Sequence, residues 1–152
     1  MNILLIYATN SGGTYLCSQI IQDILSARGH TVDIKNVRSL DPSLMTSADL
    51  IILGSPSWDY EGLEGQVHED YRPFMEKAKL VDVSGRRFAV YGLGDSSYTQ
   101  FCGCAKHLEE FVDAIGGKRV GETLRIDSFY FNQLQNEGRV RTWAETLSSL
   151  LG

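Results

Sequence analysis

Polar residues flanked by glycine follow the first apolar run of the chain, and they could hold an anion. Residues 2–7 form a continuous apolar run typical of a buried strand, and the loop 8–14 carries hydroxyl and amide donors beside two glycines. Such donors, together with the free N–H groups of a following helix, suit a phosphate. The loop has no Lys or Arg and lacks the Gly-Lys-Ser/Thr ending of a nucleotide-hydrolysing phosphate loop. It predicts either a phosphate held by neutral donors or an N-capped helix after a glycine turn.

Two further loops, residues 54–62 and 92–103, carry aromatic residues beyond the ends of apolar runs. Trp58 cannot enter the core beneath its strand, so either a flat ligand or the protein's own surface must cover it. In the third loop, small residues surround Tyr98, and glycines leave backbone groups open to the edge of a planar ligand. Together the three loops describe a site for a flat heteroaromatic with a terminal phosphate on a polyol or sugar arm.

Alternating strand-like and helix-like segments must position these loops. Apolar runs predict strands at 2–7, 31–37, 49–54, 87–92 and 118–127, the last with a kink at Gly121. Helical patterns fall at 14–28, 64–76, 104–115 and 140–151. This alternation predicts a parallel sheet covered by helices on both faces, with segment 31–37 at an edge. Ligands of such sheets lie outside the carboxyl ends of the strands, where the strand order reverses.

The motifs in these loops resemble those of the flavodoxin family. Residues 9–14 (TNSGGT) are similar to its Thr/Ser-x-Thr-Gly-x-Thr phosphate loop, residues 92–98 (GLGDSSY) with 101–103 (FCG) resemble its third flavin loop, and 124–127 (LRID) resembles its last strand. The resemblance covers the whole chain and fits the short-chain form. It implies an α/β fold, a flavodoxin-like doubly wound five-stranded parallel sheet with helices on both faces, in a single domain of residues 1–152.

The resemblance also implies FMN, bound tightly but not covalently. Its phosphate would sit on residues 9–14, Trp58 and Tyr98 would flank the isoalloxazine, and backbone groups of the second and third loops would meet its polar edge. The cofactor-binding residues expected on this basis are Thr9, Asn10, Ser11, Gly12, Gly13, Thr14, Pro56, Ser57, Trp58, Asp59, Leu93, Gly94, Asp95, Tyr98, Gln100, Phe101 and Cys102.

The function implied by the resemblance is that of a low-potential one-electron carrier between redox enzymes, without catalytic residues. In the family, a peptide of the second loop turns its carbonyl toward the flavin, and here that would be the Trp58–Asp59 peptide. Asp59 stands where many relatives have Gly. Carboxylates beside the ring, with no Lys or Arg in the three loops, disfavour added negative charge and favour a strong reductant.

Acidic residues are concentrated near the second loop. The chain has 14 Lys and Arg against 19 Asp and Glu, a net charge of -5, which makes a nucleic-acid partner improbable. The acidic stretch at residues 59–76 is either a solvated face or a docking surface for redox partners with basic surfaces, such as reductases and electron acceptors. The acids concerned are Asp59, Glu61, Glu64, Glu69, Asp70 and Glu76.

Other signals concern the environment of the protein. The apolar opening run is too short for a signal peptide or a membrane span. Cys17, Cys102 and Cys104 are an odd set, which favours free thiols, and we expect a cytoplasmic monomer. Residues 102 and 104 are poorly spaced for a disulfide, and Cys104 falls on a core stripe. The three histidines lack metal-ligand spacing and are expected at the surface, with no metal site.

Two alternative functions use the same fold and cofactor. One is a flavodoxin-like FMN reductase acting on a quinone or NADPH, although no site for a second substrate is evident in the sequence. The other is a dedicated flavoprotein activator of a metalloenzyme. A receiver domain is disfavoured because Thr9, Asn10 and Ser55 occupy the positions where it needs acidic residues.

Overall fold

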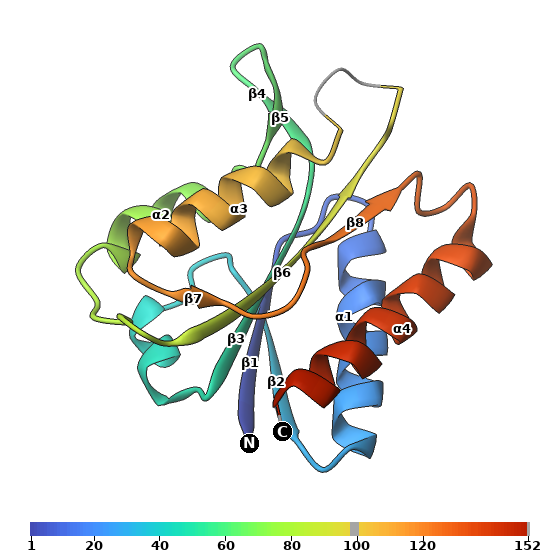
Figure 1. The fold of residues 1–152 in the computed structure, drawn as a ribbon. Coiled ribbons are helices and arrows are strands. Elements are labelled where there is room, and N and C mark those ends of the chain that lie inside the picture. Colours follow the sequence, from blue (N-terminus) through green and yellow to red (C-terminus); the bar gives the residue numbers. More distant parts are fainter. Residues whose placement is uncertain (98–100, 152) are drawn as a thin grey trace.

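The computed structural model describes residues 1–97 and 101–151, and it contains a twisted parallel sheet between two pairs of helices (Figure 1). The strand order is β2-β1-β3-β6, and the last two strands both pair with β6. The order therefore reverses between β1 and β3, which confirms the doubly wound topology. The strands of this sheet are β1 (Asn2–Tyr7), β2 (Thr31–Asn36), β3 (Leu50–Pro56), β6 (Arg87–Gly94), β7 (Lys118–Arg119) and β8 (Leu124–Asp127).

The fifth position of the sheet is divided between two short strands. β7 pairs with the start of β6 and β8 with its end, all in parallel register. Gly121 lies between them with φ +71°, so the predicted kink is confirmed and is sharp enough to interrupt the strand. At the opposite edge, β2 pairs only with β1 among the described strands, as its alternating pattern predicts.

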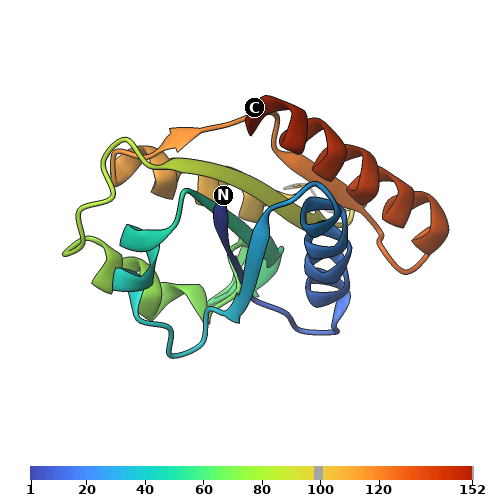
Figure 2. The ribbon, with the colours of Figure 1, turned by 90° about the horizontal axis from the view of Figure 1, so that it is seen from below.

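Helices cover both faces of the sheet (Figure 2). The alternation of side chains along its strands divides the core in two. Ile3 and Leu5 of β1 pack in the core beneath α1 (Gly13–Ala27) and α4 (Gln133–Leu151). Leu4 and Ile6 point to the other face, beneath α2 (Tyr71–Ala78) and α3 (Gly103–Ala114). Apolar side chains alternate in this way because successive residues of a strand face opposite sides. A short 3-10 helix, η1 (Pro42–Ser47), precedes β3.

The helix expected at 64–76 is wrong over its first half. Residues 58–66 form an antiparallel hairpin of β4 (Trp58–Tyr60) and β5 (Leu63–Gln66), and α2 begins only at Tyr71. Glu61 and Gly62 both have positive φ, 50° and 81°, which turns the chain back at that point. This two-residue turn favours a hairpin, although the residues after it have a weak helical pattern of apolar residues.

Two buried tyrosines fix the backbone where β1 and β3 diverge. From one face, the Tyr71 hydroxyl donates to the carbonyls of Ile6 at 3.0 Å and Gly54 at 2.9 Å. From the other face, the Tyr91 hydroxyl donates to the carbonyl of Thr14 at 3.2 Å. Burial raises the pKa of both phenols above their usual range, so they remain neutral donors. The strand ends from which the first and second loops depart are thereby held in place.

Within residues 1–97 and 101–151, no helix is both long and apolar enough to cross a membrane.

Candidate functional site

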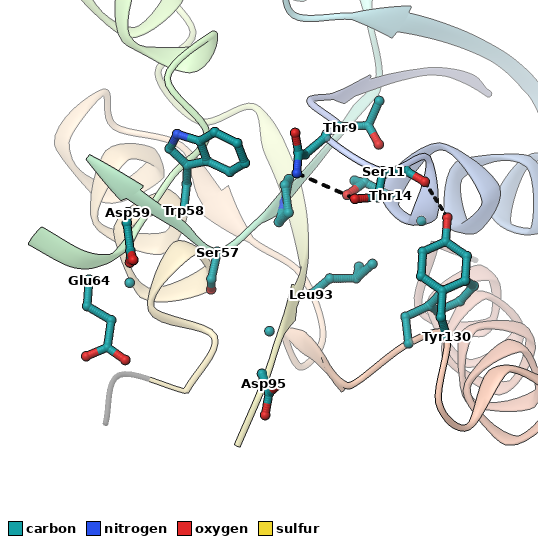
Figure 3. A pocket seen from close by; sticks show the side chains of 16 residues that line it. Thr9, Ser11, Thr14, Ser57, Trp58, Asp59, Glu64, Leu93, Asp95 and Tyr130 are labelled. Carbon is teal, nitrogen blue, oxygen red and sulfur yellow. Dashed lines mark hydrogen bonds between the residues drawn. The ribbon is translucent and has the colours of Figure 1, made fainter. Parts of the chain in front are cut away.

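A cavity of about 440 Å³ opens at the carboxyl ends of β1, β3 and β6, on the switch point of the sheet (Figure 3). All three loops singled out in the sequence contribute to its walls, and so do the hairpin and the segment after β8. Its size lies within the usual range for small-ligand sites. The lining residues are Thr9, Asn10, Ser11, Gly13, Thr14, Pro56, Ser57, Trp58, Asp59, Glu64, Gly65, Leu93, Gly94, Asp95, Phe129 and Tyr130.

One end of the cavity is an anion cradle at the N-terminus of α1. Gly12 has φ +88°, and its N–H donates to Thr9 Oγ1 at 2.9 Å, which shapes the turn into the helix. Thr14 is only 1% exposed, and its Oγ1 has no hydrogen-bond partner among the described residues. A buried hydroxyl without a partner is costly unless a ligand satisfies it. This hydroxyl and the helix N-terminus therefore fit a phosphate group, such as that of FMN.

The other end of the cavity is formed by Trp58. Its indole is half-buried and packs against the His68 ring, with centroids 4.8 Å apart. Figure 3 shows Trp58 across the cavity from Tyr130, a position where one ring face can meet a planar ligand. The protein therefore covers one side of Trp58 with the His68 ring, and the cavity leaves room for a flat ligand as well.

The surface position expected for His68 is wrong. His68 is 7% exposed, since its ring lies against Trp58, and its Nδ1 accepts a hydrogen bond from the Asp70 N–H at 3.1 Å. Its own backbone N–H donates to Ser55 Oγ at 3.0 Å. With these contacts, His68 is a buried side chain that supports the second loop, and it is not solvated. Within the described part of the chain, no group of His, Cys, Asp and Glu side chains could hold a metal ion.

The third loop is tied to its neighbours on both sides. The Ser57 N–H donates to the Leu93 carbonyl at 2.7 Å, which joins the second and third loops. On the other side, the Asp127 carboxylate accepts from the Ser96 N–H at 2.8 Å and from its hydroxyl at 2.7 Å. These hydrogen bonds from Ser96 lower the pKa of Asp127 below its usual value. Hydrogen bonds therefore hold Leu93 and Ser96, the residues of this loop on either side of Asp95.

Three described residues of the expected binding set, Gly12, Phe101 and Cys102, do not line the cavity. Two more, Tyr98 and Gln100, lie outside the described residues. Gly12 is in the cradle but its backbone serves the turn, and Phe101 is exposed at the start of the segment leading to α3. Cys102 precedes α3 and is buried, with its thiol directed to the carbonyls of Gly92 and Ile126.

All three cysteines are free, as expected, and all three are buried. Burial raises the pKa of Cys102 to about 12 and that of Cys104 to about 11. Cys104 packs in the core beneath α3, where its thiol donates to the Ser55 carbonyl at 3.3 Å. Thiols that stay protonated and buried are poor nucleophiles, so this pair has a packing role.

The rim of the cavity is negatively charged. Asp59, Glu64 and Asp95 contribute carboxylates, and none of the described lining residues is a Lys or Arg (Figure 3). Glu76 of this stretch pairs with Lys79 at 3.0 Å, and the Asp70 carboxylate lies 3.6 Å from His68 Nδ1. The others, Asp59, Glu61, Glu64 and Glu69, have no ion pair with any described residue. Unpaired carboxylates at the rim disfavour negative charge on a bound ligand.

Fold and site together define a class of protein. A doubly wound sheet that joins an anion cradle to an aromatic wall at its switch point is built to bind a phosphorylated planar ligand. The carboxylates at the rim oppose the addition of negative charge to such a ligand.

Comparison with known proteins identifies the family within this class. The flavodoxin family model matches residues 5–143, and the chain belongs to the flavodoxin family. It is 32% identical over 127 residues to "Probable flavodoxin 2" of Bacillus subtilis, covering 83% of this chain and 82% of that protein. The flavodoxin of Maridesulfovibrio salexigens is 29% identical, with 82% and 84% covered. The crystal structure of oxidised flavodoxin 2 from Bacillus cereus superposes with a TM-score of 0.87 at 27% identity, covering 98% and 99%.

Family membership determines the class of activity. Flavodoxins are FMN-binding electron-transfer proteins and not enzymes, and they exchange electrons with redox partners. This chain is accordingly an FMN-dependent electron carrier, and the reductase alternative is set aside.

Sequence reasoning missed three lining residues, namely Gly65, Phe129 and Tyr130. It counted Glu64 among the carboxylates beside the ring but not among the cofactor-binding residues, because residues 64–76 were expected to be helical. The aromatic pair could have been found, because it directly follows the last strand at the same edge of the sheet as the three loops. The loop motifs of the resemblance follow three of the strands, whereas this aromatic pair follows a fourth.

Proposed function

We propose that this chain binds FMN in the cavity at the switch point and carries single electrons at low potential between redox proteins. The observation that carries the proposal is the buried Thr14 hydroxyl, which faces the cavity at the N-terminus of α1 without a partner among the described residues. We assign the phosphate to residues 9–14 and one face of the ring to Trp58. We also retain Tyr98, Gln100, Phe101 and Cys102 as proposed members of the site.

When bound, FMN supplies reversible one-electron reduction, and the chain determines how readily the electron is accepted. Asp59, Glu64 and Asp95 oppose added negative charge, which lowers the potential. The family resemblance assigns the carbonyl that turns toward the ring to the Trp58–Asp59 peptide. This peptide lies where the hairpin register shifts between the pairs Trp58–Gln66 and Tyr60–Leu63. Asp59 does not have positive φ in this structure.

The partners are proposed to dock through basic surfaces on the acids of residues 59–76. Asp59 and Glu64 line the cavity rim, and Glu61 and Glu69 are exposed residues of the same stretch. Long-range attraction from such a surface accelerates encounter and is screened by salt. We further propose that residues 1–152 act as one FMN-binding domain, monomeric and cytoplasmic. A specialised role as the activator of one metalloenzyme would use this same surface.

Binding and reduction of FMN test the central proposal. Protein freed of flavin should take up one FMN, turn yellow, and accept electrons in two separate one-electron steps during a reductive titration followed by visible absorbance. Steady-state oxidation of NADPH by the loaded protein alone should be absent. A colourless protein that rejects added FMN would contradict the proposal.

Removal of two exposed acids of residues 59–76 tests the docking surface. The double variant Glu61→Gln/Glu69→Gln should slow electron transfer to a basic c-type cytochrome several-fold at low ionic strength. It should also flatten the salt dependence of the rate. The matched control is Glu145→Gln, an exposed acid on α4, which should behave like the unaltered protein. Equal rates for the two variants at every salt concentration would show that residues 59–76 are merely solvated.

A further inference from the structure

Tyr130 contacts the phosphate loop from a distant part of the chain. It lies between β8 and α4, and its hydroxyl donates to the Ser11 carbonyl at 2.5 Å (Figure 3). Its ring and hydroxyl also lie over the glycines of the loop: a Cβ added at Gly13 would be 3.6 Å from the ring, and one added at Gly12 would be 3.4 Å from the hydroxyl. The loop is therefore covered by Tyr130 on the side of α4.

The contact fixes one particular peptide. The Ser11 carbonyl accepts from Tyr130, and the Gly12 N–H of the same peptide donates to Thr9 Oγ1 at 2.9 Å. A peptide held at both its C=O and its N–H cannot rotate without losing two hydrogen bonds. Free rotation would let the carbonyl oxygen turn toward the cradle, where its partial negative charge would repel a bound phosphate.

The segment that presents Tyr130 is itself well anchored. Asn136 is buried, and its side-chain amide donates to the carbonyls of Asp127 at 3.0 Å and Phe129 at 3.3 Å. Phe129 is buried and meets the Tyr130 ring edge-on, with centroids 5.2 Å apart. Tyr130 is half-exposed but stands on a rigid support, as a positioning residue requires.

We propose that Tyr130 is a positioning residue for the cofactor phosphate, which it serves by locking the Ser11–Gly12 peptide with its carbonyl outward. The inference rests on the proposed binding of FMN in this cavity. It assigns a task to a residue outside the three loops that the family resemblance singles out. It also predicts that the contribution of Tyr130 is specific to the phosphate and does not extend to the flavin ring.

The test compares FMN with riboflavin, which has the same ring system but no phosphate. Tyr130→Phe keeps the ring and removes the hydroxyl, so it should weaken FMN binding about three- to tenfold, the usual effect of one lost hydrogen bond. Riboflavin affinity should stay within about twofold of the original. Quenching of flavin fluorescence during titration of the flavin-free protein measures both dissociation constants.

Tyr15→Phe is the matched control, because Tyr15 is an exposed tyrosine of α1 outside the cavity lining. It should alter neither affinity. Unchanged FMN affinity in Tyr130→Phe would overturn the inference, and so would an equal loss for FMN and riboflavin, which would mean general support of the pocket. Unaltered protein that binds neither flavin would instead contradict the proposed function and remove the premise of the inference.

Discussion

Gly54→Ala should lower the free energy of unfolding by about 3 kcal/mol, at the upper end of the range for overpacked cores. A Cβ at this position would lie 2.1 Å from Tyr91 Cζ and 2.5 Å from its hydroxyl oxygen. The Tyr91 ring cannot move aside easily, because it is fully buried and its hydroxyl is bonded to the Thr14 carbonyl. The Gly54 backbone is equally constrained, since its carbonyl accepts from both Tyr71 and the Ala8 N–H.

Urea unfolding followed by circular dichroism measures the change, and Gly138→Ala is the control. Gly138 lies within α4, and a Cβ there would meet nothing within 4 Å. Alanine should therefore raise stability by up to about 1 kcal/mol through helix propensity. A Gly54→Ala variant as stable as the original would show that β3 and Tyr91 can separate at little cost, contrary to the packing described.

Gly54→Ala should also weaken FMN binding in protein that remains folded. Displacement of Tyr91 would release the Thr14 carbonyl and so disturb the first turn of α1, which supplies the anion cradle. The effect should be larger for FMN than for riboflavin. Titration of both flavins below the unfolding transition separates this local effect from global destabilisation.

Trp58→Ala should weaken FMN binding by about 1–3 kcal/mol, the typical value of one aromatic stacking contact. This corresponds to a roughly 5- to 150-fold higher dissociation constant. His68 already holds one side of the indole, so little ordering cost accompanies ligand binding, and most of the stacking energy should appear as affinity. Trp58→Phe should retain much of it.

Fluorescence titration of the flavin-free variants measures the loss. Leu63→Ala is the control for loosening of the hairpin, because Leu63 is 60% exposed and lies on the partner strand outside the cavity lining. It should bind FMN like the original protein. Unchanged affinity in Trp58→Ala would show that the indole does not cover the ring.

The sequence alone predicts those helices and strands whose own residues carry a clear apolar pattern. The continuous apolar runs of β1, β3 and β6 predict buried parallel strands, and α3 has a clear apolar stripe. The hairpin of β4 and β5 was missed because it depends on a two-residue turn at Glu61–Gly62 and has little apolar pattern of its own.

Features of the site that depend on distant residues could not be predicted in the same way. His68 is buried because Trp58 lies against it, and no periodicity of the sequence indicates that contact. Tyr130 reaches Ser11 across 119 residues of chain, so only the folded topology brings them together. The loops themselves were predictable because the rule for parallel sheets places them at one edge.

The paired tyrosines beneath the switch point bear on how fast electrons can move. Tyr71 and Tyr91 fix the backbone from opposite faces, and their buried hydroxyls donate to backbone carbonyls. Dipoles that are fixed before a charge arrives need not reorient when it does. The reorganisation energy of transfer should accordingly be small, and its motion should be confined to the hairpin and the solvent. The rate would then be governed by the driving force and by how closely a partner approaches the ring.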